Sequence, residues 1–249
     1  MRKLILILLT IFSVSLLAFQ PGEKLTFEIK YGVISAGEAT LQIEDHTYRD
    51  SIETYRITSL ANTNSFFDHV YKVRDRLESI WRKRGLVTLR FTKKLREGSY
   101  RQHRIHFYYP DQNFTIYTKI KKKKTSQERM EIADKTQDIF SAFYYYRLQD
   151  FSVGDTLVIN VTADGRNYPA KIVAHRLETI ETIFGDKECI VVEPILEGEA
   201  IFKQTGEIYI WLTYDEHKIP VLMSSKIIFG HFKAILKDAE NVPFKITEK

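Results

Sequence analysis

The stretch with the clearest capacity to bind a charged group is RFTKKLREGSYRQHRIHFYY, residues 90 to 109, in which Lys, Arg and His far outnumber a single Glu. The wider segment from 70 to 124 holds 17 Lys plus Arg and four Asp plus Glu, whereas the formal net charge of the whole chain is only +5. A guanidinium group suits phosphate or carboxylate because its planar fork donates two parallel hydrogen bonds. The side chains that we expect to contact an anionic group are Arg90, Lys94, Arg96, Arg101 and Arg104.

The alternation of residue types in this stretch predicts a β-hairpin. On a strand from 87 to 97, odd positions such as Leu89 share an apolar face and even positions such as Arg90 share a cationic one. Residues 97 to 99 form the turn, and the second strand follows. Two interpretations remain open. The cations are solvated or paired with Asp and Glu elsewhere in the chain, or they face an external anion that relieves the repulsion between like charges on paired strands.

A second basic feature is the run of four lysines at Lys121, Lys122, Lys123 and Lys124. Consecutive residues of a strand point to opposite faces, so this run cannot be buried and is typical of a solvated loop or strand end. The alternative is contact with an anionic membrane surface or lipopolysaccharide, to which clustered cations are attracted. Nucleic acid is not expected as a partner, because an exported chain rarely meets it.

One segment breaks the strand pattern. Residues 136 to 149 carry apolar side chains three and four positions apart, which predicts a helix, with Asp134 as a candidate capping residue. The helix is rich in aromatic residues, among them Phe140, Phe143 and Tyr144. These rings either fill the core between two sheets or cover an apolar cavity that binds a lipid or glycan.

Evidence for catalysis in the sequence is weak. His103 and His106 are three residues apart, so on one strand they point to opposite faces and cannot share a metal ion. Carboxylates at Glu193, Glu197 and Glu199 could in principle flank a glycosidic bond, although Pro194 and Gly198 interrupt that strand. There is no phosphate-binding loop, nucleophile elbow or metal-ligand cluster, and we expect neither a cofactor nor a metal.

Most of the remaining chain alternates apolar and polar residues with period two, which predicts many short antiparallel strands. Two halves of this pattern, about 22 to 130 and 154 to 238, share landmarks at a nearly constant offset: Gly22 and Gly154 are 132 residues apart, and Trp81 and Trp211 are 130 apart. Chance similarity between meanders is the alternative to an ancient duplication. The sequence therefore predicts an all-β protein with one central helix, in which two related antiparallel meanders form an open barrel or sandwich.

The N-terminus, MRKLILILLTIFSVSLLAFQPGEK, has two cations, a short apolar run and a polar, turn-prone end. This is the layout of a signal peptide over residues 1 to 18, and the apolar run is shorter than a membrane span. We expect a single β-rich domain from 19 to 249 that is located in the periplasm or at the outer membrane. Cys189, the only cysteine, lies in an apolar strand pattern and is expected to be buried.

Several segments together resemble a bacterial family known only as domain of unknown function 3108. They are GEKLTFEIKYGVISAGEATLQI, DRLESIWRKRGLVTLRFTKKLREGSY, DIFSAFYYYR and the long stretch from Cys189 to Gly230. The resemblance implies an exported, β-rich protein and supplies no catalytic residues. The hairpin IWLTYDEHKIPVLMSSK is also similar, in architecture only, to hairpins of periplasmic lipoprotein carriers, which are open β-barrels with a helix across the mouth.

Together these observations favour a non-enzymatic envelope protein that binds an amphipathic or anionic ligand, such as a lipid, lipopolysaccharide or glycan. The apolar part of the ligand would lie against the aromatic helix, and the basic hairpin would hold the negative group. Two alternatives remain: a structural or assembly protein that binds an acidic protein partner, and an enzyme that acts on envelope glycan.

Overall fold

The computed structural model describes residues 18–122, 124–196, 207–227 and 230–247. The described residues form 14 strands in one antiparallel sheet, one helix of nine residues and two single turns of helix. The strands are β1 Lys24–Tyr31, β2 Ile34–Tyr48, β3 Ile52–Thr63, β4 Arg74–Arg82, β5 Val87–Glu97, β6 Tyr100–Tyr109, β7 Phe114–Lys121, β8 Lys124–Glu131, β9 Thr156–Ala163, β10 Arg166–Thr182, β11 Gly185–Leu196, β12 Ile208–Thr213, β13 Pro220–Ile227 and β14 Gly230–Glu240. The helical elements are α1 Ser65–Asp68, the 3₁₀ turn η1 Pro110–Gln112 and α2 Ile139–Arg147.

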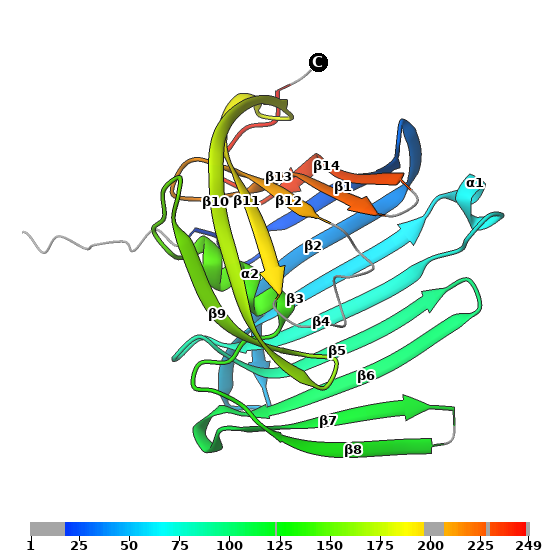
Figure 1. Cartoon of the computed structure of the whole chain (residues 1–249), viewed down its shortest axis with the longest axis vertical. Helices are drawn as coiled ribbons and strands as arrows, with labels where there is room; N and C mark the ends of the chain where they lie inside the picture. Colours follow the sequence, from blue (N-terminus) through cyan, green and yellow to red (C-terminus); the bar gives the residue numbers. More distant parts are fainter. Residues whose placement is uncertain (1–17, 123, 197–206, 228–229, 248–249) are drawn as a thin grey trace, which may run out of the picture.

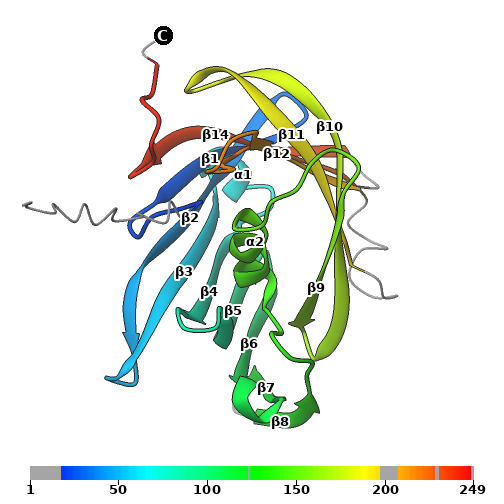
Figure 2. The ribbon, with the colours of Figure 1, turned by 90° about the vertical axis from the view of Figure 1, so that its left-hand side faces the viewer.

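The sheet consists of two meanders that meet at a single strand pair. Its order is β8-β7-β6-β5-β4-β3-β2-β1-β14-β13-β12-β11-β10-β9, so β1 pairs with β14 in the middle and β8 and β9 are the outer strands. Figures 1 and 2 show the sheet curving round until its two ends approach each other. The fold is therefore all-β with one central helix in an open barrel, as the sequence predicts.

The helix α2 lies inside this curved sheet, between the first meander and the second (Figure 2). It begins at Ile139, capped by Asp138, which differs from the predicted start at 136 with Asp134 as the cap. The reason is a long-range pairing: Gln137 forms a parallel bridge with Val161 of β9, through hydrogen bonds of 2.8 and 2.9 Å to the neighbouring backbone. The backbone N–H and carbonyl of Gln137 are used in this strand pairing, so the helix begins after it.

The two meanders share one core. A single cluster of buried residues combines Leu25 and Trp81 of the first meander with Cys189 and Leu236 of the second, and Tyr144 of α2 joins it. Cys189 is fully buried, as expected, and burial raises the pKa of its thiol to about 12. The core thus extends across the central pair of strands.

The core reaches back to the predicted end of the signal peptide. Phe19 is only 3% exposed and packs edge-on against Tyr55 and Tyr144, with ring centroids 5.5 and 5.0 Å away. Beside it, the fully buried guanidinium of Arg147 pairs with both carboxylate oxygens of Glu23 at 2.6 and 2.8 Å. Residues 18 to 23 are consequently integral to the folded structure.

The two ends of the sheet meet through side chains rather than a strand ladder. We call this contact the seam: the β9–β10 turn rests on β5, β6 and β7. The Gly165 backbone N–H donates to Nε2 of His106 at 3.2 Å, and the Tyr108 hydroxyl donates to the Thr162 carbonyl at 2.8 Å. Lys93 pairs with Asp164 at 2.8 Å. These contacts close the curve where backbone pairing stops.

The predicted sequence landmarks occupy equivalent strands of the two meanders. Trp81 lies on β4 and Trp211 on β12, which are the fourth strands of their meanders. Pro220 is the first residue of β13, a position where the missing N–H removes no ladder bond from the strand interior. Common ancestry of the halves stays a prediction.

Within the described ranges, neither helix has the length and apolar run that a membrane crossing requires.

Candidate functional site

An apolar cavity of about 280 Å³ lies between α2 and the concave face of the sheet. Strands of both meanders and the helix contribute to its wall. The lining residues are Phe27, Ala39, Thr40, Leu41, Ser59, Ile139, Phe140, Ala142, Phe143, Tyr146, Val161, Ala170, Ile172, Val192, Pro194, Ile208, Ile210, Pro220 and Met223. This cavity forms because the curved sheet is wider than a nine-residue helix can fill.

The helix presents two of its three predicted ligand-binding rings to this space. Phe140 and Phe143 line the cavity, whereas Tyr144 lies outside it and is fully buried in the shared core. The Tyr144 hydroxyl donates to the Glu23 carboxylate at 3.3 Å, so its polar tip already has a protein partner. Tyr146, which was not among the predicted residues, takes part in the wall and stacks on Phe151 at 4.3 Å.

The chemistry of the cavity wall is almost entirely apolar. Among the described residues that line it, none is Lys, Arg, Asp, Glu or His, and the polar ones are Thr40, Ser59 and Tyr146. A charged group would lose its hydration there without gaining a counter-charge. An apolar cavity of about 150 Å³ already accommodates benzene or xenon in a protein core, so this larger space suits a hydrocarbon chain.

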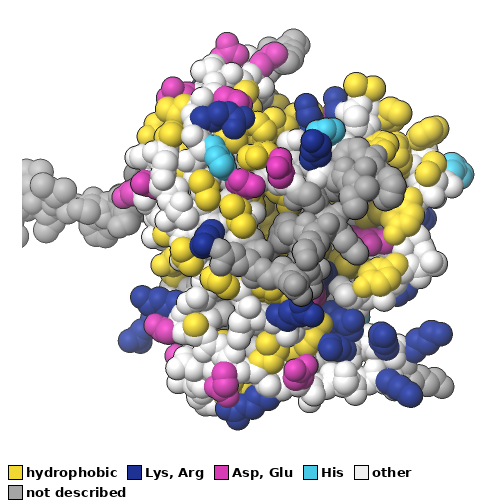
Figure 3. All heavy atoms as spheres, in the orientation of Figure 1, with side chains coloured by type: hydrophobic (Ala, Val, Ile, Leu, Met, Phe, Trp, Pro, Cys, Tyr) yellow, Lys and Arg dark blue, Asp and Glu magenta, His cyan; other side chains and the backbone are white. Residues whose placement is uncertain are grey.

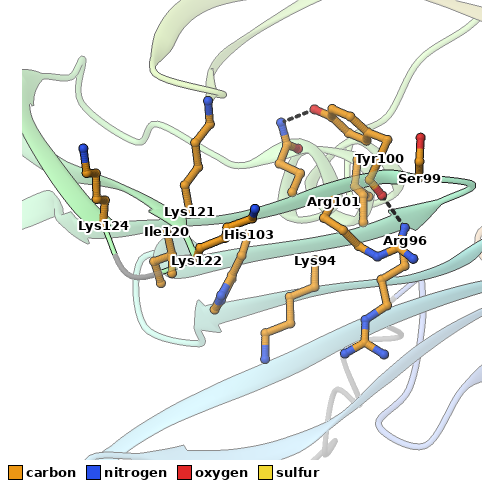
Figure 4. Close-up of a pocket in the computed structure, with 12 residues that line it drawn as sticks. Lys94, Arg96, Ser99, Tyr100, Arg101, His103, Ile120, Lys121, Lys122 and Lys124 are labelled. Carbon is orange, nitrogen blue, oxygen red and sulfur yellow. Dashed lines mark hydrogen bonds between the residues drawn. The ribbon is translucent and has the colours of Figure 1, made fainter.

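A second recess, which we call the basic cleft, lies at the tips of β5 to β8 (Figure 4). The β6–β7 ladder ends at the pair Arg104 and Lys119, although β6 begins four residues earlier at Tyr100. Beyond that pair the two strands diverge, and the cleft, with a volume of about 1220 Å³, occupies the gap. The residues that line it are Lys94, Leu95, Arg96, Ser99, Tyr100, Arg101, Gln102, His103, Ile120, Lys121, Lys122 and Lys124.

The electrostatics of the basic cleft are one-sided. It has no Asp or Glu among its lining residues. Arg101 donates to two backbone carbonyls, those of Gly98 and Tyr100, each at 2.7 Å, which orients the guanidinium without neutralising it. Burial and the nearby Lys94 charge lower the pKa of His103, which therefore stays neutral near pH 7. The described lining residues give the cleft a positive charge that can attract an anion.

The five cations that the sequence singled out do not form one group. Lys94, Arg96 and Arg101 line the basic cleft, but Arg90 pairs with the Glu78 carboxylate at 2.6 Å. Arg104 stands opposite Lys93 in the β5–β6 register, so it lies on the concave face, whereas Lys94 and its partner His103 lie on the convex face. The proposed anion contacts are thus reduced to three of the five.

Carboxylates neutralise part of the basic segment. Besides Arg90, Arg74 pairs with Asp68 at 2.6 Å and Arg82 with Asp111 at 2.9 Å. The Arg74 guanidinium and the Thr63 hydroxyl hold the pKa of Asp68 at about 2. Several cations without such a partner lie together at the tips of β5 to β8, where Figure 3 shows a group of Lys and Arg side chains at the lower right of the molecule. Charge is therefore concentrated at one end of the hairpins rather than along a whole sheet face.

The apolar cavity and the basic cleft are separate sites, because no residue lines both. The composite site expected from the sequence, with one ligand held by the helix and the basic hairpin together, is not assembled. No described residue supplies a positive charge to the cavity wall, and none of α2 reaches the basic cleft.

The described residues contain no cluster of three or more His, Cys, Asp and Glu side chains that could hold a metal ion. His103 and His106 lie on opposite faces of β6, as their spacing predicts. Glu193 is engaged with His175 at 2.8 Å, while Glu197 and Glu199 lie outside the described residues. Among the described residues that line the cavity and the cleft there is no carboxylate.

Comparison with known proteins places the chain in a family. Residues 26–237 match the model of a protein family of unknown function, DUF3108. The chain belongs to the DUF3108 family. No curated protein matches it at a significant level.

The fold also resembles solved structures of distant sequence. A β-barrel-like protein of the DUF1849 family from Brucella abortus superposes with a TM-score of 0.58 at 10% identity, covering 90% of this chain and 99% of that protein. The superposition on the hypothetical protein CT021 from Chlamydia trachomatis covers 94% of this DUF3108 chain and 95% of that protein, with a TM-score of 0.38 and 8% identity. The first of these likenesses supports the barrel-like fold and carries no information on ligands.

Sequence reasoning missed the half of the cavity wall that the second meander supplies. Ala170 and Ile172 on β10 and Ile210 on β12 face the helix from across the barrel. The period-two pattern of β10 (Tyr168, Ala170, Ile172, Ala174) marks its buried face, but nothing in the sequence shows that this face stands opposite α2 with space between them.

Proposed function

We propose that this DUF3108 protein is exported to the cell envelope and holds the hydrocarbon part of a lipid in the cavity beneath α2. The observation that carries the proposal is a space of about 280 Å³ beneath α2 whose described lining residues offer hydrocarbon contacts and no charge. An acyl chain fits such a wall better than a glycan, because sugar hydroxyls would lose their hydrogen bonds to water there.

The energetics favour an occupant. An apolar occupant makes dispersion contacts with this wall that water does not supply, because the described lining residues offer few hydrogen-bonding groups. Filling the space with hydrocarbon recovers the missing dispersion contacts and removes the acyl chain from water.

Export is supported by the sequence of the first 18 residues and by the position of the expected cleavage point. Ala18 and Phe19 are 4% and 3% exposed in the folded protein, and the Ala18 carbonyl accepts a hydrogen bond of 2.8 Å from Arg147. A peptidase needs an exposed, extended backbone, so cleavage at this bond would have to precede folding. Cell fractionation with N-terminal sequencing of the mature protein tests the location and the start residue.

The ligand proposal is tested by filling the cavity. Ser59 lines it from β3, whereas its neighbour Thr58 lies on the opposite face of the same strand; both are half-buried. Ser59→Phe should occupy the space, and Thr58→Phe is a matched control with the same added ring. Native mass spectrometry of protein purified from its own envelope detects a bound acyl compound. Titration of delipidated protein with a long-chain fatty acid measures uptake.

We expect wild type and Thr58→Phe to carry and rebind an acyl compound, and Ser59→Phe to lose it. Wild-type protein that arrives without lipid and takes up no fatty acid would overturn the proposal. So would a Ser59→Phe variant that folds and binds as well as its control.

A further inference from the structure

Four connections at one end of the first meander form a continuous edge, which we call the loop rim. In an antiparallel meander every second connection lies at the same end, so the β1–β2 turn, the β3–β4 connection with α1, the β5–β6 turn and the β7–β8 turn are grouped there. Figure 1 shows these tips side by side at the right-hand ends of the strands. The loop rim is defined by residues 32–36, 64–73, 96–101 and the described residues of 121–124.

The loop rim is a built structure rather than a set of loose loops. The Asn64 side chain caps α1 and donates to the Ser35 carbonyl at 2.6 Å, which fastens α1 to the start of β2. The Gly98 N–H donates to the Lys72 carbonyl at 2.8 Å. A Cβ on Gly98 would lie 2.8 Å from the Tyr71 ring, so only glycine lets these two connections pack together. The β1–β2, β3–β4 and β5–β6 connections are consequently held in fixed positions relative to one another.

These fixed tips expose large apolar side chains. Val33 is 93% exposed, Val70 72% and Phe66 64%. Ile34, Tyr71 and Tyr100 on the same rim are also exposed. A folded chain leaves such side chains in water at a cost, and a concentration of them at one edge marks an interaction site.

The same edge carries the unneutralised cations. Lys121, Lys122 and Lys124 are exposed at the β7–β8 turn, and within the described chain no carboxylate lines the cleft beside them. Arg96 and Arg101 face the same cleft, as Figure 4 shows. Among the acidic residues of the rim, Asp68 is paired with Arg74 and Lys72. Burial and the neighbouring Asp75 raise the pKa of Glu97, the other carboxyl group of the rim.

We infer that the loop rim docks on an anionic lipid surface, with Val33, Phe66 and Val70 entering the interface and the lysines of the β7–β8 turn facing the phosphates. The combination of protruding apolar tips with clustered lysines matches the two layers of a membrane interface. The apolar residues project from separate turns instead of forming one flat patch. A fluid lipid surface accommodates separate points, whereas a protein partner would need a matching shape for each.

The inference does not require the cavity to hold a ligand. It is tested with the exported, processed full chain and two sets of vesicles, one of pure phosphatidylcholine and one that also contains phosphatidylglycerol. Co-sedimentation measures the partition coefficient. The charge variant is Lys121→Gln with Lys122→Gln and Lys124→Gln, and its matched control removes three exposed cations elsewhere, Arg84→Gln with Lys135→Gln and Lys245→Gln.

The apolar variant is Val33→Ser with Val70→Ser, and its control is Val153→Ser with Val158→Ser, two exposed valines outside the loop rim. We expect binding to the phosphatidylglycerol vesicles only. Each lysine removed should weaken it about fivefold, so the triple variant loses on the order of 100-fold. The apolar rim variant should also bind more weakly than wild type, and both controls should bind as wild type does.

Equal binding to both kinds of vesicle, no binding to either, or rim variants that behave like their controls would overturn the inference. Recovery of an acidic protein in cross-linking experiments, without vesicle binding, would also overturn it and assign the surface to that partner. Rim variants should still take up fatty acid as wild type does, so failure of membrane docking is distinguishable from failure of the cavity proposal.

Discussion

Acidification should weaken the seam through His106. This side chain is 1% exposed, and its Nε2 accepts the Gly165 N–H at 3.2 Å, which only an unprotonated Nε2 can do. The ring stacks on Tyr117 at 4.4 Å and lies 3.4 Å from the Thr115 hydroxyl. Burial lowers the pKa of His106 from 6.5 to about 4, although the Asp164 carboxylate opposes the shift. The folded state therefore favours the neutral ring.

The sign of the effect follows from linkage. Because the folded-state pKa is below the unfolded value, the contribution of His106 is complete above pH 6.5 and is lost as pH falls from 6.5 towards 4. At about 1.4 kcal/mol per pKa unit, the full contribution is roughly 3 kcal/mol, of which about 2.5 kcal/mol is lost at pH 4.5. Protonation would also turn the acceptor towards Gly165 into a donor and leave the β9–β10 turn without that contact.

Urea unfolding at pH 7.5 and at pH 4.5 measures this loss in wild type and in His106→Phe, which keeps a flat ring for Tyr117 but cannot titrate. The variant should be less stable at pH 7.5, because the Gly165 N–H loses its acceptor. Between pH 7.5 and pH 4.5 the free energy of unfolding of His106→Phe should fall by about 2.5 kcal/mol less than that of wild type. Lys93→Met leaves Asp164 unpaired and should raise the pKa of His106, so its acid transition moves to higher pH. Equal acid losses in wild type and His106→Phe would refute the reasoning.

Three further substitutions test the packing that positions the cavity, each by urea unfolding at pH 7.5. Glu23→Gln leaves the fully buried Arg147 without a counter-charge and should cost about 3–5 kcal/mol, part of which Arg147→Met restores in the double variant. Phe19→Ala removes a 3% exposed ring from the shared core and should cost about 3–5 kcal/mol; a loss near zero would mean that this residue does not pack. Gly165→Ala places a Cβ 2.5 Å from the Tyr117 ring and should lower the free energy of unfolding by about 1–3 kcal/mol. The control is Gly154→Ala, because Gly154 has a similar φ (+92° against +81°) and its added Cβ would meet no atom.

The basic hairpin was predictable because its signals are local. The alternation from 87 to 97 and the glycine at 98 lead directly to β5, β6 and the turn between them. The same parity separates Arg104 from Lys94, Arg96 and Arg101 once the two strands are placed in register. The prediction placed all five cations in one anion-binding group, whereas alternate residues of the hairpin point to opposite faces of the sheet.

Other features depend on contacts that span the whole chain. The first turn of α2 is displaced because Gln137 pairs with a strand more than 20 residues later, and helix propensity contains no information on that pairing. The cavity exists only because β10 and β12 stand across the barrel from α2. The exposed valines of the loop rim look like ordinary apolar strand-end residues in the sequence. Their 93% and 72% exposure appears only when the turns are built.

The helix α2 is held at both ends by buried polar contacts, and the edge where the sheet does not close is the weakest part of the cavity wall in terms of backbone pairing. At its N-terminus the buried Asp138 accepts hydrogen bonds from Ser79 at 2.6 Å and Thr88 at 3.0 Å, and at its C-terminus Arg147 binds Glu23. Arg147 also donates to the His217 carbonyl of the second meander at 3.0 Å, and Gln137 pairs with β9, so α2 is fastened to both meanders. At the far edge the second meander is joined to the first by the side chains of the seam and by the Asn167 amide, which donates to the Glu131 carbonyl at 2.7 Å. Separating the two ends of the sheet there breaks side-chain hydrogen bonds and one ion pair, whereas separating any two neighbouring strands breaks a backbone ladder, so this edge is where the curved sheet opens with the least loss of strand pairing.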